Sequence, residues 1–537
     1  MAAAERTFLP DPAAPRRKRE GRVFAISAGT LIDECNKLIR KHERYMRKMR
    51  EDDIRRSRRA TLPATATLLR PSYWDIDRGF NPYLVRANAE PIARAVNAAL
   101  RSRDYRPRSP VAHTVAKPGG GERIVSVFQV VDAVVSRAVY NSLLAKNRAL
   151  MSARSYAYRS DLSTHDAIQY ISSEFTAADR LYVAEYDFSK YFDSISHEYL
   201  WAILDRNRFL ITPAEREILR AFLLTIAMSE AGYAPAAITG ESSYGLPQGT
   251  SISLFLANAA AWELDRGLER LGVGFVRYAD DTLIWSHDYG QVAEAVNVLR
   301  RASTGIGAEL NPKKSKGIRL FVPGGEPAEI ASTSEVNFVG YRFARGKIGL
   351  RSEVVKRMKS RMEYLIWSNL LQALQDGTFN PRRVNPPLDR DYLVLLRQLQ
   401  RYLYGNLTES KVREFQRGAV KRMRYPGVMS YFPLVDDLDQ LQGIDGWLVS
   451  TTCQALGKRG RMLADLGVAS LPTPHGLSRN ALIRAEAKTS AGDYVDLTIP
   501  SVTRYSAVLR QAATLFGANT VGKGSGADEY RYMFSSF

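Results

Sequence analysis

One segment, FVRYADDTLIW at residues 275–285, constrains the fold of this chain more than any other. Apolar residues flank its Asp280-Asp281 pair on both sides, which predicts a tight β-hairpin with two aspartates at its tip. A second apolar run, LYVAEYD at residues 181–187, predicts a strand that ends at Asp187, where the chain turns. We therefore expect these three aspartates, from two separate strands, to lie close together.

Three carboxylates gathered at one point suit a particular chemistry. Nucleotidyl transfer uses two divalent cations about 4 Å apart, one activating the attacking 3′-hydroxyl and one holding the triphosphate. Mg²⁺ requires hard oxygen ligands, and bound cations make such an acidic cluster tolerable. A Tyr-x-Asp-Asp motif alone arises by chance in a chain this long roughly 5–10% of the time, and Asp-Asp at a turn is also ordinary hairpin chemistry. The pair must therefore be judged with its neighbours.

The composition indicates a polyanionic partner. The chain has 537 residues, 45% of them hydrophobic, which is enough for several domains with buried cores. Its formal charge of +20 favours a nucleic-acid partner. The alternatives are a soluble basic protein without such a partner and a protein that touches anionic membranes.

The cysteines and the apolar segments bear on the compartment. The two cysteines, Cys35 and Cys453, exclude a disulfide framework and any zinc module with four thiolates. The first 20 residues contain no apolar signal region, and the most apolar segment, residues 253–262, is too short to span a bilayer. We expect a cytoplasmic protein without a membrane partner.

The chain divides into three regions by pattern. Residues 1–70 predict a basic N-terminal helical extension, because residues 31–56 read as a basic amphipathic helix that either grips phosphates or presents a solvated face. Residues 71–345 alternate helical patterns with short β-rich runs, which is typical of an α+β domain. Residues 346–537 are mostly helical, with amphipathic patterns at 352–375 and 390–405.

The motifs around the aspartates resemble those of reverse transcriptases. VAEYDFSKYFD resembles motif A of that family, GLPQGTSISLFLANAAAWELD motif B, YADD motif C, LNPKKSK motif D and NFVGYRF motif E. Upstream, KPGGGERIVSVFQVVDAVVSRAV and SYAYRSDLSTHDAI resemble the two fingers blocks. Seven blocks in the family's order make chance agreement negligible. The resemblance implies an α+β right-hand polymerase with fingers, a palm built on an antiparallel sheet, a thumb and a mostly α-helical C-terminal extension.

The resemblance also implies roles for individual residues in an RNA-directed DNA polymerase that adds dNTPs with two Mg²⁺ ions, or with Mn²⁺. The expected metal ligands, which are also catalytic, are Asp187, Asp280 and Asp281, assisted by the Phe188 carbonyl. The expected nucleotide-binding residues are Gln248, Gly249, Arg123 and Lys117. Lys314 is expected to protonate the leaving pyrophosphate, with Lys313 and Lys316 close enough to compete for that role. Arg159 is expected either to support the template or the nucleotide, or to form a structural ion pair.

Phe192, five residues after Asp187, bears on the choice of nucleotide. In reverse transcriptases an aromatic residue here occupies the place of a ribose 2′-hydroxyl, whereas related RNA-copying RNA polymerases usually carry Asp. Rejecting a misfit group in a tight pocket can be decisive, so Phe192 favours dNTPs. The alternative is that Phe192 is simply the first core residue of the following helix.

Departures from the family pattern indicate a branch. GGERIVSVFQ replaces the Arg-Pro-Leu of intron-encoded enzymes, and QGTSISLFLAN lacks their Ser-Pro. FNPYLVR, the TSIS variant and the long helical C-terminal extension resemble bacterial unknown-group and abortive-infection reverse transcriptases. That resemblance implies antiphage defence, with a dedicated non-coding RNA as template or partner, a DNA product, and an oligomer as one option.

Two other functional readings remain open. Some relatives prime on their own protein, and the tail tyrosines Tyr530 and Tyr532 are candidate primers. Template-independent or protein-primed synthesis on the same fold is therefore one alternative. The other is a nucleic-acid-binding scaffold whose polymerase site is inactive.

Overall fold

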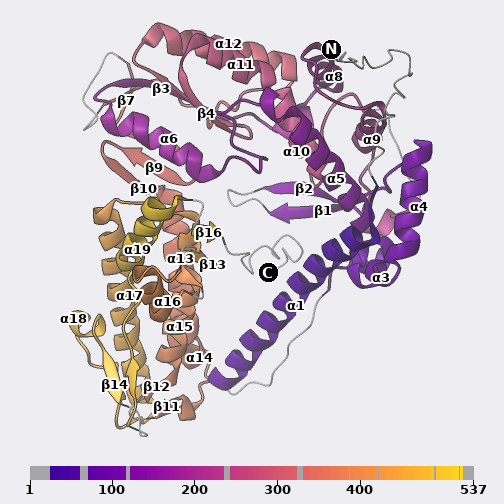
Figure 1. Ribbon diagram of the computed structural model, residues 1–537. Coiled ribbons are helices and arrows are strands. Elements are labelled where there is room, and N and C mark those ends of the chain that lie inside the picture. Colours follow the sequence, from indigo (N-terminus) through magenta and orange to yellow (C-terminus); the bar gives the residue numbers. More distant parts are fainter. Residues whose placement is uncertain are drawn as a thin grey trace, which may run out of the picture.

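The computed structural model describes most of the chain (Figure 1). The residues described are 25–60, 70–116, 121–234, 242–322, 330–385, 388–405, 407–420, 423–488, 492–518 and 521–523. Within these ranges, no helix combines the length and the apolar character that crossing a membrane requires.

A five-stranded sheet lies at the centre of the molecule. Its strands run in the order β4-β5-β3-β6-β7, and every neighbouring pair is antiparallel except β6 and β7. The strands are β3 (Leu181–Tyr186), β4 (Gly274–Tyr278), β5 (Asp281–Ser286), β6 (Gly317–Phe321) and β7 (Ser332–Thr333). The apolar runs that predicted two strands and a hairpin therefore form β3 and the β4–β5 hairpin, as expected.

Both faces of this sheet are buried, which explains why its strands are apolar without alternation. On one face, Val183 and Leu283 pack with α6 (Thr164–Ala177). On the other face, their neighbours Ala184 and Ile284 pack with the helices that Figure 1 shows along the opposite side of the sheet. These helices are α8 (His197–Arg206), α10 (Ser251–Ala260), α11 (Trp262–Leu271) and α12 (Tyr289–Ile306).

The region before the sheet is a cluster of helices with one β-hairpin. In β1 and β2, residues Val111 and Val127 are paired at one end of the hairpin, and Ala116 and Glu122 at the other. The elements here are α1 (Ala28–Arg59), α2 (Tyr73–Ile76), α3 (Pro82–Ala87), α4 (Ala89–Ser102), β1 (Val111–Ala116), β2 (Glu122–Val127) and α5 (Val130–Asn147). Two further helices, α7 (Tyr191–Ser194) and α9 (Pro213–Leu223), follow β3. The helix predicted at residues 31–56 is thus part of the longer α1.

A second sheet joins the central part to the C-terminal helices. Its strands β8 (Glu335–Phe338), β9 (Tyr341–Ala344) and β10 (Lys347–Leu350) form an antiparallel meander. The Tyr341 hydroxyl donates to the Tyr431 carbonyl, and the Asp436 carboxylate accepts from the Ile348 amide at 2.6 Å. One continuous hydrophobic core runs from the central sheet through β9 into the C-terminal helices, so these helices are packed firmly on the sheet.

The C-terminal region is mostly helical, as predicted. The helix expected at 352–375 is divided at Leu371, and the helix expected at 390–405 ends at Tyr404. Its helices are α13 (Ser352–Leu370), α14 (Gln372–Gln375), α15 (Arg390–Tyr404), α16 (Glu409–Gln416), α17 (Leu438–Asp465), α18 (Arg479–Leu482) and α19 (Val502–Phe516). Short strand pairs are formed by β11 (Val384–Asn385) with β12 (Leu388–Asp389), β13 (Met423–Tyr425) with β16 (Val521–Lys523), and β14 (Glu486–Lys488) with β15 (Tyr494–Asp496).

Candidate active site

The tip of the β4–β5 hairpin carries the first two aspartates. Tyr278 pairs with Asp281, which leaves Ala279 and Asp280 as the two turn residues. Ala279 adopts a φ of 61°, in the left-handed region that two-residue hairpins use. The predicted hairpin is therefore confirmed, with Asp280 in the turn and Asp281 at the start of β5.

Asp187 meets this tip through the register of the neighbouring strand. Tyr186 of β3 pairs with Thr282 of β5, so the next position along each strand places Asp187 opposite Asp281. The negative charge of Asp187 raises the pKa of both Asp280 and Asp281, although burial of each carboxyl raises it more. The structure thus brings the three sequence-predicted aspartates together at one end of the sheet.

The carboxyl of Asp281 has a strongly raised pKa. Burial first, and then Asp187 and Asp280, raise the pKa of its carboxyl to about 7. For Asp280 the Lys314 and Arg123 charges act in the opposite direction and lower the pKa, without cancelling the effect of burial. Burial and the neighbouring carboxylates therefore favour the protonated forms of Asp280 and Asp281 more than in an ordinary aspartate.

Lys314 is the basic residue that reaches Asp187. Its Nζ donates to Asp187 Oδ2 at 2.7 Å, whereas Lys316 pairs with Glu185 at 3.0 Å. The Asp187 carbonyl accepts from the Asn311 amide at 2.8 Å, so the segment that carries Lys314 is attached to the end of β3. Of the three lysines predicted from sequence as candidates, the structure places Lys314 in contact with Asp187.

The residues present suit a divalent cation by their donor chemistry. Three carboxylates supply the hard oxygens that Mg²⁺ prefers, and burial first, then the neighbouring carboxylates, raise the pKa of two of them. Across the described part of the chain, however, no three His, Cys, Asp or Glu side chains already converge as a metal cage. Because Asp187 Oδ2 accepts from Lys314, cation binding through this oxygen requires the lysine to release it.

Gln248 and Gly249 connect the candidate site to the β1–β2 hairpin. The Ser126 amide of β2 donates to the Gln248 carbonyl at 2.6 Å, and the Gln248 amide group donates to Asp193 Oδ1 at 2.7 Å. Gly249 has a φ of 135°, and a Cβ there would lie 2.2 Å from the Ser126 carbonyl oxygen. Glycine is thus required here because the backbone of β2 approaches closely.

Arg123 lies on the same strand β2, paired with Val115 of β1. Its side chain is exposed, and its charge lowers the pKa of Asp280 and of Tyr158. The Arg123 charge therefore lies near enough to Asp280 to act on it electrostatically.

Phe192 is half-buried and packs against Tyr158, a residue that the sequence analysis did not single out. The two rings lie edge to face, with centroids 6.1 Å apart. Burial, and then Asp280, raise the pKa of the Tyr158 hydroxyl to about 12. Tyr158 therefore packs on Phe192 and lies near enough to Asp280 for the two groups to interact electrostatically. Its φ of 60° shows that the backbone there is held in an uncommon conformation. The second tyrosine of the SYAYR segment was the available signal for it.

Arg277 is the second residue that the sequence analysis missed. It lies in β4 and is fully buried, and its guanidinium makes two bonds of 2.7 Å to the Asp265 carboxylate. It also donates to the Ala279 carbonyl at 2.9 Å and to Ser155 Oγ at 2.8 Å. Arg277 thus fixes the turn that carries Asp280 to α11 and to the segment before α6. An arginine inside an otherwise apolar strand was the signal for it.

The remaining predicted residues fall into two groups. Arg159 pairs with Asp161 at 2.6 Å, its Nη1 donates to the Ser152 carbonyl, and its side chain is buried, so the structural ion pair is the alternative that the structure favours. The Phe188 side chain is buried too, in the hydrophobic core, and its backbone lies between two bonds that join the end of β3 to residues 309–311. Lys117, Tyr530 and Tyr532 lie outside the described residues.

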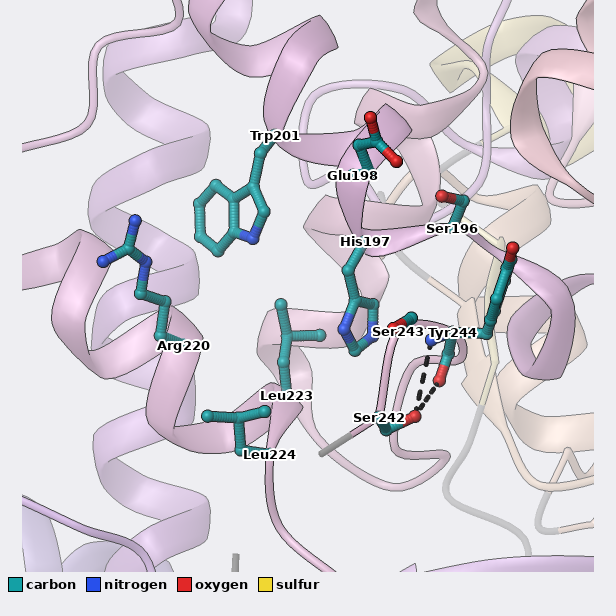
Figure 2. Close-up of a pocket in the computed structure, with 10 residues that line it drawn as sticks. All are labelled: Ser196, His197, Glu198, Trp201, Arg220, Leu223, Leu224, Ser242, Ser243 and Tyr244. Carbon is teal, nitrogen blue, oxygen red and sulfur yellow. Dashed lines mark hydrogen bonds between the residues drawn. The ribbon is translucent and has the colours of Figure 1, made fainter. Parts of the chain in front are cut away.

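A cavity of about 340 Å³ lies apart from the aspartates (Figure 2). It lies where α8 and α9 meet residues 242–244, and Trp201, Arg220 and Tyr244 line it. None of the predicted site residues lines this cavity.

Comparison with known proteins identifies the central part of the chain. Residues 115–343 match the family described as reverse transcriptase (RNA-dependent DNA polymerase). No curated protein sequence matches the chain.

Solved structures give distant similarities only. Telomerase from Candida albicans, in complex with a fragment of telomeric RNA, is 12% identical, with 73% of this chain and 67% of that chain covered and a TM-score of 0.35. Apo telomerase from Candida tropicalis, truncated from its C-terminal domain, is 11% identical, with 48% and 59% covered and a TM-score of 0.33. The RNA-dependent RNA polymerase of a human picobirnavirus is 12% identical, with 67% and 59% covered and a TM-score of 0.35. The chain thus spans about two thirds of the length of these proteins or less.

The family match and the architecture agree. An antiparallel central sheet carries the three aspartates, a β-hairpin precedes it, and a helical region follows it. This is the α+β right-hand polymerase architecture predicted from the sequence, with a palm, fingers and a thumb.

Proposed function

We propose a specific reaction for this chain on the premise that residues 115–343 form a reverse transcriptase domain, which makes the chain a nucleotidyltransferase and an RNA-directed polymerase. The reaction is the addition of dNTPs to a DNA 3′-end on an RNA template, assisted by two Mg²⁺ ions. The observation that carries this proposal is the position of Asp187 opposite the Asp280-Asp281 turn. Primer extension by the purified protein on a primed RNA, with Mg²⁺ and dNTPs, is the direct test.

In this reaction the aspartates would hold the cations, and each other residue has a separate task. Bound divalent cations would activate the 3′-hydroxyl and neutralise the triphosphate. Arg123, exposed on β2, binds the triphosphate, and the loop at Gln248 and Gly249 forms one side of the nucleotide pocket. The Ser126–Gln248 bond couples that pocket to the fingers hairpin. Lys117 remains a candidate for a second phosphate contact.

Phe192 is proposed to exclude ribonucleotides. Replacing it with alanine removes the ring that would meet a 2′-hydroxyl, so selectivity for dNTPs over NTPs is expected to fall by about 100-fold, mainly through faster NTP incorporation. The measurement is kcat/KM for matched dNTP and NTP pairs. Phe209→Leu, which alters a buried ring outside the site, is the control for lost packing. Unchanged selectivity in Phe192→Ala would show that Phe192 is only a core residue.

Lys314 is proposed to protonate the leaving pyrophosphate after releasing Asp187. Lys314→Ala is expected to lower kcat by about 10²- to 10⁴-fold, with a small change in the KM for dNTP. Lys313→Ala, one position away on the same exposed segment, is the matched control and should retain near-normal kcat. Equal effects of the two substitutions would contradict a specific role for Lys314.

The thumb is proposed to follow the template–product duplex. The N-terminal part of α13 exposes Lys356 and Arg357 directly after the second sheet, and such cations bind phosphates without regard to sequence. The division of the chain into an N-terminal extension (1–70), fingers and palm (71–345), and thumb with extension (346–537) is part of the same proposal.

The proposed biological role is antiphage defence with a dedicated non-coding RNA. Its support is the resemblance of the FNPYLVR segment, the TSIS variant and the long helical C-terminal region to defence-associated reverse transcriptases. Sequencing the RNA and DNA that copurify with the protein from cells tests template, primer and product together. A random sample of cellular RNA, with no matching DNA, would count against a dedicated template.

Template-independent or protein-primed synthesis is the second candidate. DNA made without added RNA or primer, and attached to the protein, would favour it. Loss of that attachment in a Tyr530→Phe/Tyr532→Phe protein would assign the priming residue. Inactivity of the wild type under every template condition would instead favour a scaffold.

A further inference from the structure

Helix α1 is anchored in the fingers by its N-terminal half. Leu31 and Cys35 are fully buried there in the core that α4 and α5 share, and Ile39 is buried as well. The Ile26 amide donates to Asn97 Oδ1 and the Asn97 amide group donates back to the Ile26 carbonyl, both at 2.8 Å. This end of α1 is therefore part of the fingers.

The C-terminal end of the same helix is attached to the thumb. Ala60, directly after α1, forms an isolated antiparallel bridge with Phe379, and Asn380 donates to the carbonyls of Arg58 and Arg59. Arg59 donates to Asn369 of α13 at 3.1 Å. Farther back on α1, Glu51 pairs with Arg401 of α15 at 3.3 Å. These hydrogen bonds and this ion pair are polar, in contrast to the apolar anchor in the fingers.

Between its two anchors α1 is strongly basic. Residues 40–50, KHERYMRKM flanked by Arg40 and Arg50, include one acidic side chain, Glu43. The cations are Arg40, Lys41, Arg44, Arg47, Lys48 and Arg50. Arg40, Arg47 and Arg50 are exposed to solvent. A helix that only linked the fingers to the thumb would not need these exposed positive charges. A polyanion is the partner that this stretch fits.

We infer that α1 closes the polymerase hand into a ring around the template–product duplex. In Figure 1 the helix runs from the fingers, beside α3, to the far end of the thumb, on the side of the molecule away from the central sheet. Palm, fingers, α1 and thumb are thus joined in a closed circuit by the contacts named above. The basic stretch of α1 contacts the duplex phosphates, and the contacts with Asn369, Phe379 and Asn380 are the latch that opens to admit nucleic acid. This inference rests on the proposed function, because it needs a duplex bound at the palm.

The latch can be locked with a disulfide. Residues directly opposite in an antiparallel pair have Cα atoms about 4.5–5.5 Å apart, within the range that a disulfide spans. The variant is Ala60→Cys/Phe379→Cys, made with Cys453→Ser so that the half-exposed native thiol is absent. Cys35 can stay, because it is buried and burial raises the pKa of its thiol to about 11. The two single-cysteine proteins are the matched controls.

Loading is tested with one RNA in two forms. A circular RNA with an annealed DNA primer and the same RNA cut at one site are offered to the oxidised and to the reduced variant. We expect the oxidised protein to extend the primer on the cut RNA at least tenfold better than on the circle, because a closed ring loads only over an end. Reduction should restore extension on the circle, and the single-cysteine proteins should extend both forms alike.

Trapping gives a second readout that needs no catalysis. The reduced variant is bound to each RNA, then oxidised, and the complexes are washed in 1 M NaCl, which weakens phosphate contacts. Retention of the circle at least tenfold above that of the cut RNA supports the ring. Equal loss of both RNAs, or extension on the circle by protein oxidised beforehand, overturns it.

Failure of the proposed function gives a different result. In that case the unmodified protein would not extend the primer on either RNA, while the salt-wash comparison would still report whether α1 encloses nucleic acid.

Discussion

Replacing Asp281 with asparagine is expected to lower nucleotide addition by at least about 10³-fold, a loss of several kcal/mol of transition-state stabilisation. The amide keeps the size of the side chain but cannot supply an anionic oxygen to a divalent cation. Primer extension measures the loss. Asp439→Asn, at a side chain that is exposed on α17, is the control and should stay active. Substantial activity in Asp281→Asn would remove Asp281 from the catalytic site.

The same substitution is expected to stabilise the protein in the absence of divalent cations. Burial and the neighbouring aspartates raise the pKa of Asp281 to about 7, from an ordinary value of 3.8. The folded state binds this proton more tightly than the unfolded state does. The free energy of unfolding therefore falls as pH rises from about 4 to 7 and stays at this lower value above pH 7. Asparagine does not ionise, so at pH 8 with EDTA the variant should gain about 1–4 kcal/mol.

Thermal unfolding with and without Mg²⁺ tests this account of the cluster. Mg²⁺ should raise the Tm of the wild type, because the cation relieves repulsion among the three carboxylates. The Tm of Asp281→Asn should respond less. At pH 5, where the wild-type carboxyl is largely protonated, the two proteins should have similar Tm values. A variant that is less stable than the wild type at pH 8 would contradict the charge effect assigned to Asp281.

Replacing Arg277 with methionine is the change with the largest expected effect on stability outside the aspartates. It leaves the Asp265 carboxylate buried without its partner, which typically costs about 3–5 kcal/mol. Denaturant unfolding measures this loss. Arg266→Met is the control, because Arg266 belongs to a half-exposed ion pair on the same helix as Asp265 and should cost less than about 1 kcal/mol.

A double variant separates the two tasks of Arg277. In Arg277→Met/Asp265→Leu no buried charge is left unpaired, so much of the stability should return. Polymerase activity should not return with it, because the Ala279 carbonyl in the catalytic turn still lacks the guanidinium donor. Full recovery of both stability and activity would assign Arg277 to the core alone.

The amino-acid sequence determined the local structure and the chemical identity of the site. The apolar runs before Asp187 and around Asp280-Asp281 are too short for helices and end at polar turns, so they could only be strands that present carboxylates at their ends. The amphipathic periods likewise predicted α1 and α15. Such information is local, because side-chain period and turn chemistry depend on residues a few positions apart.

Only the tertiary structure decided which distant groups act on one another. Lys314 lies 127 residues after Asp187 in the chain, and nothing in its sequence neighbourhood separates it from Lys313 or Lys316; the bond follows from the attachment of its segment to the end of β3. The clash that a side chain at position 249 would make with the Ser126 carbonyl likewise arises only when the loop packs on β2.

The tertiary structure alone also decides which elements a helix connects and whether a charged side chain is buried. The periodicity of α1 predicted a basic helix, but not that one end is buried in the fingers and the other is bonded to the thumb. The residue type of Arg277 does not by itself show whether its side chain is exposed to solvent or buried in a hydrogen-bond network. Burial and partnership depend on how elements far apart in sequence pack together, and that packing is set by the whole core rather than by any one segment.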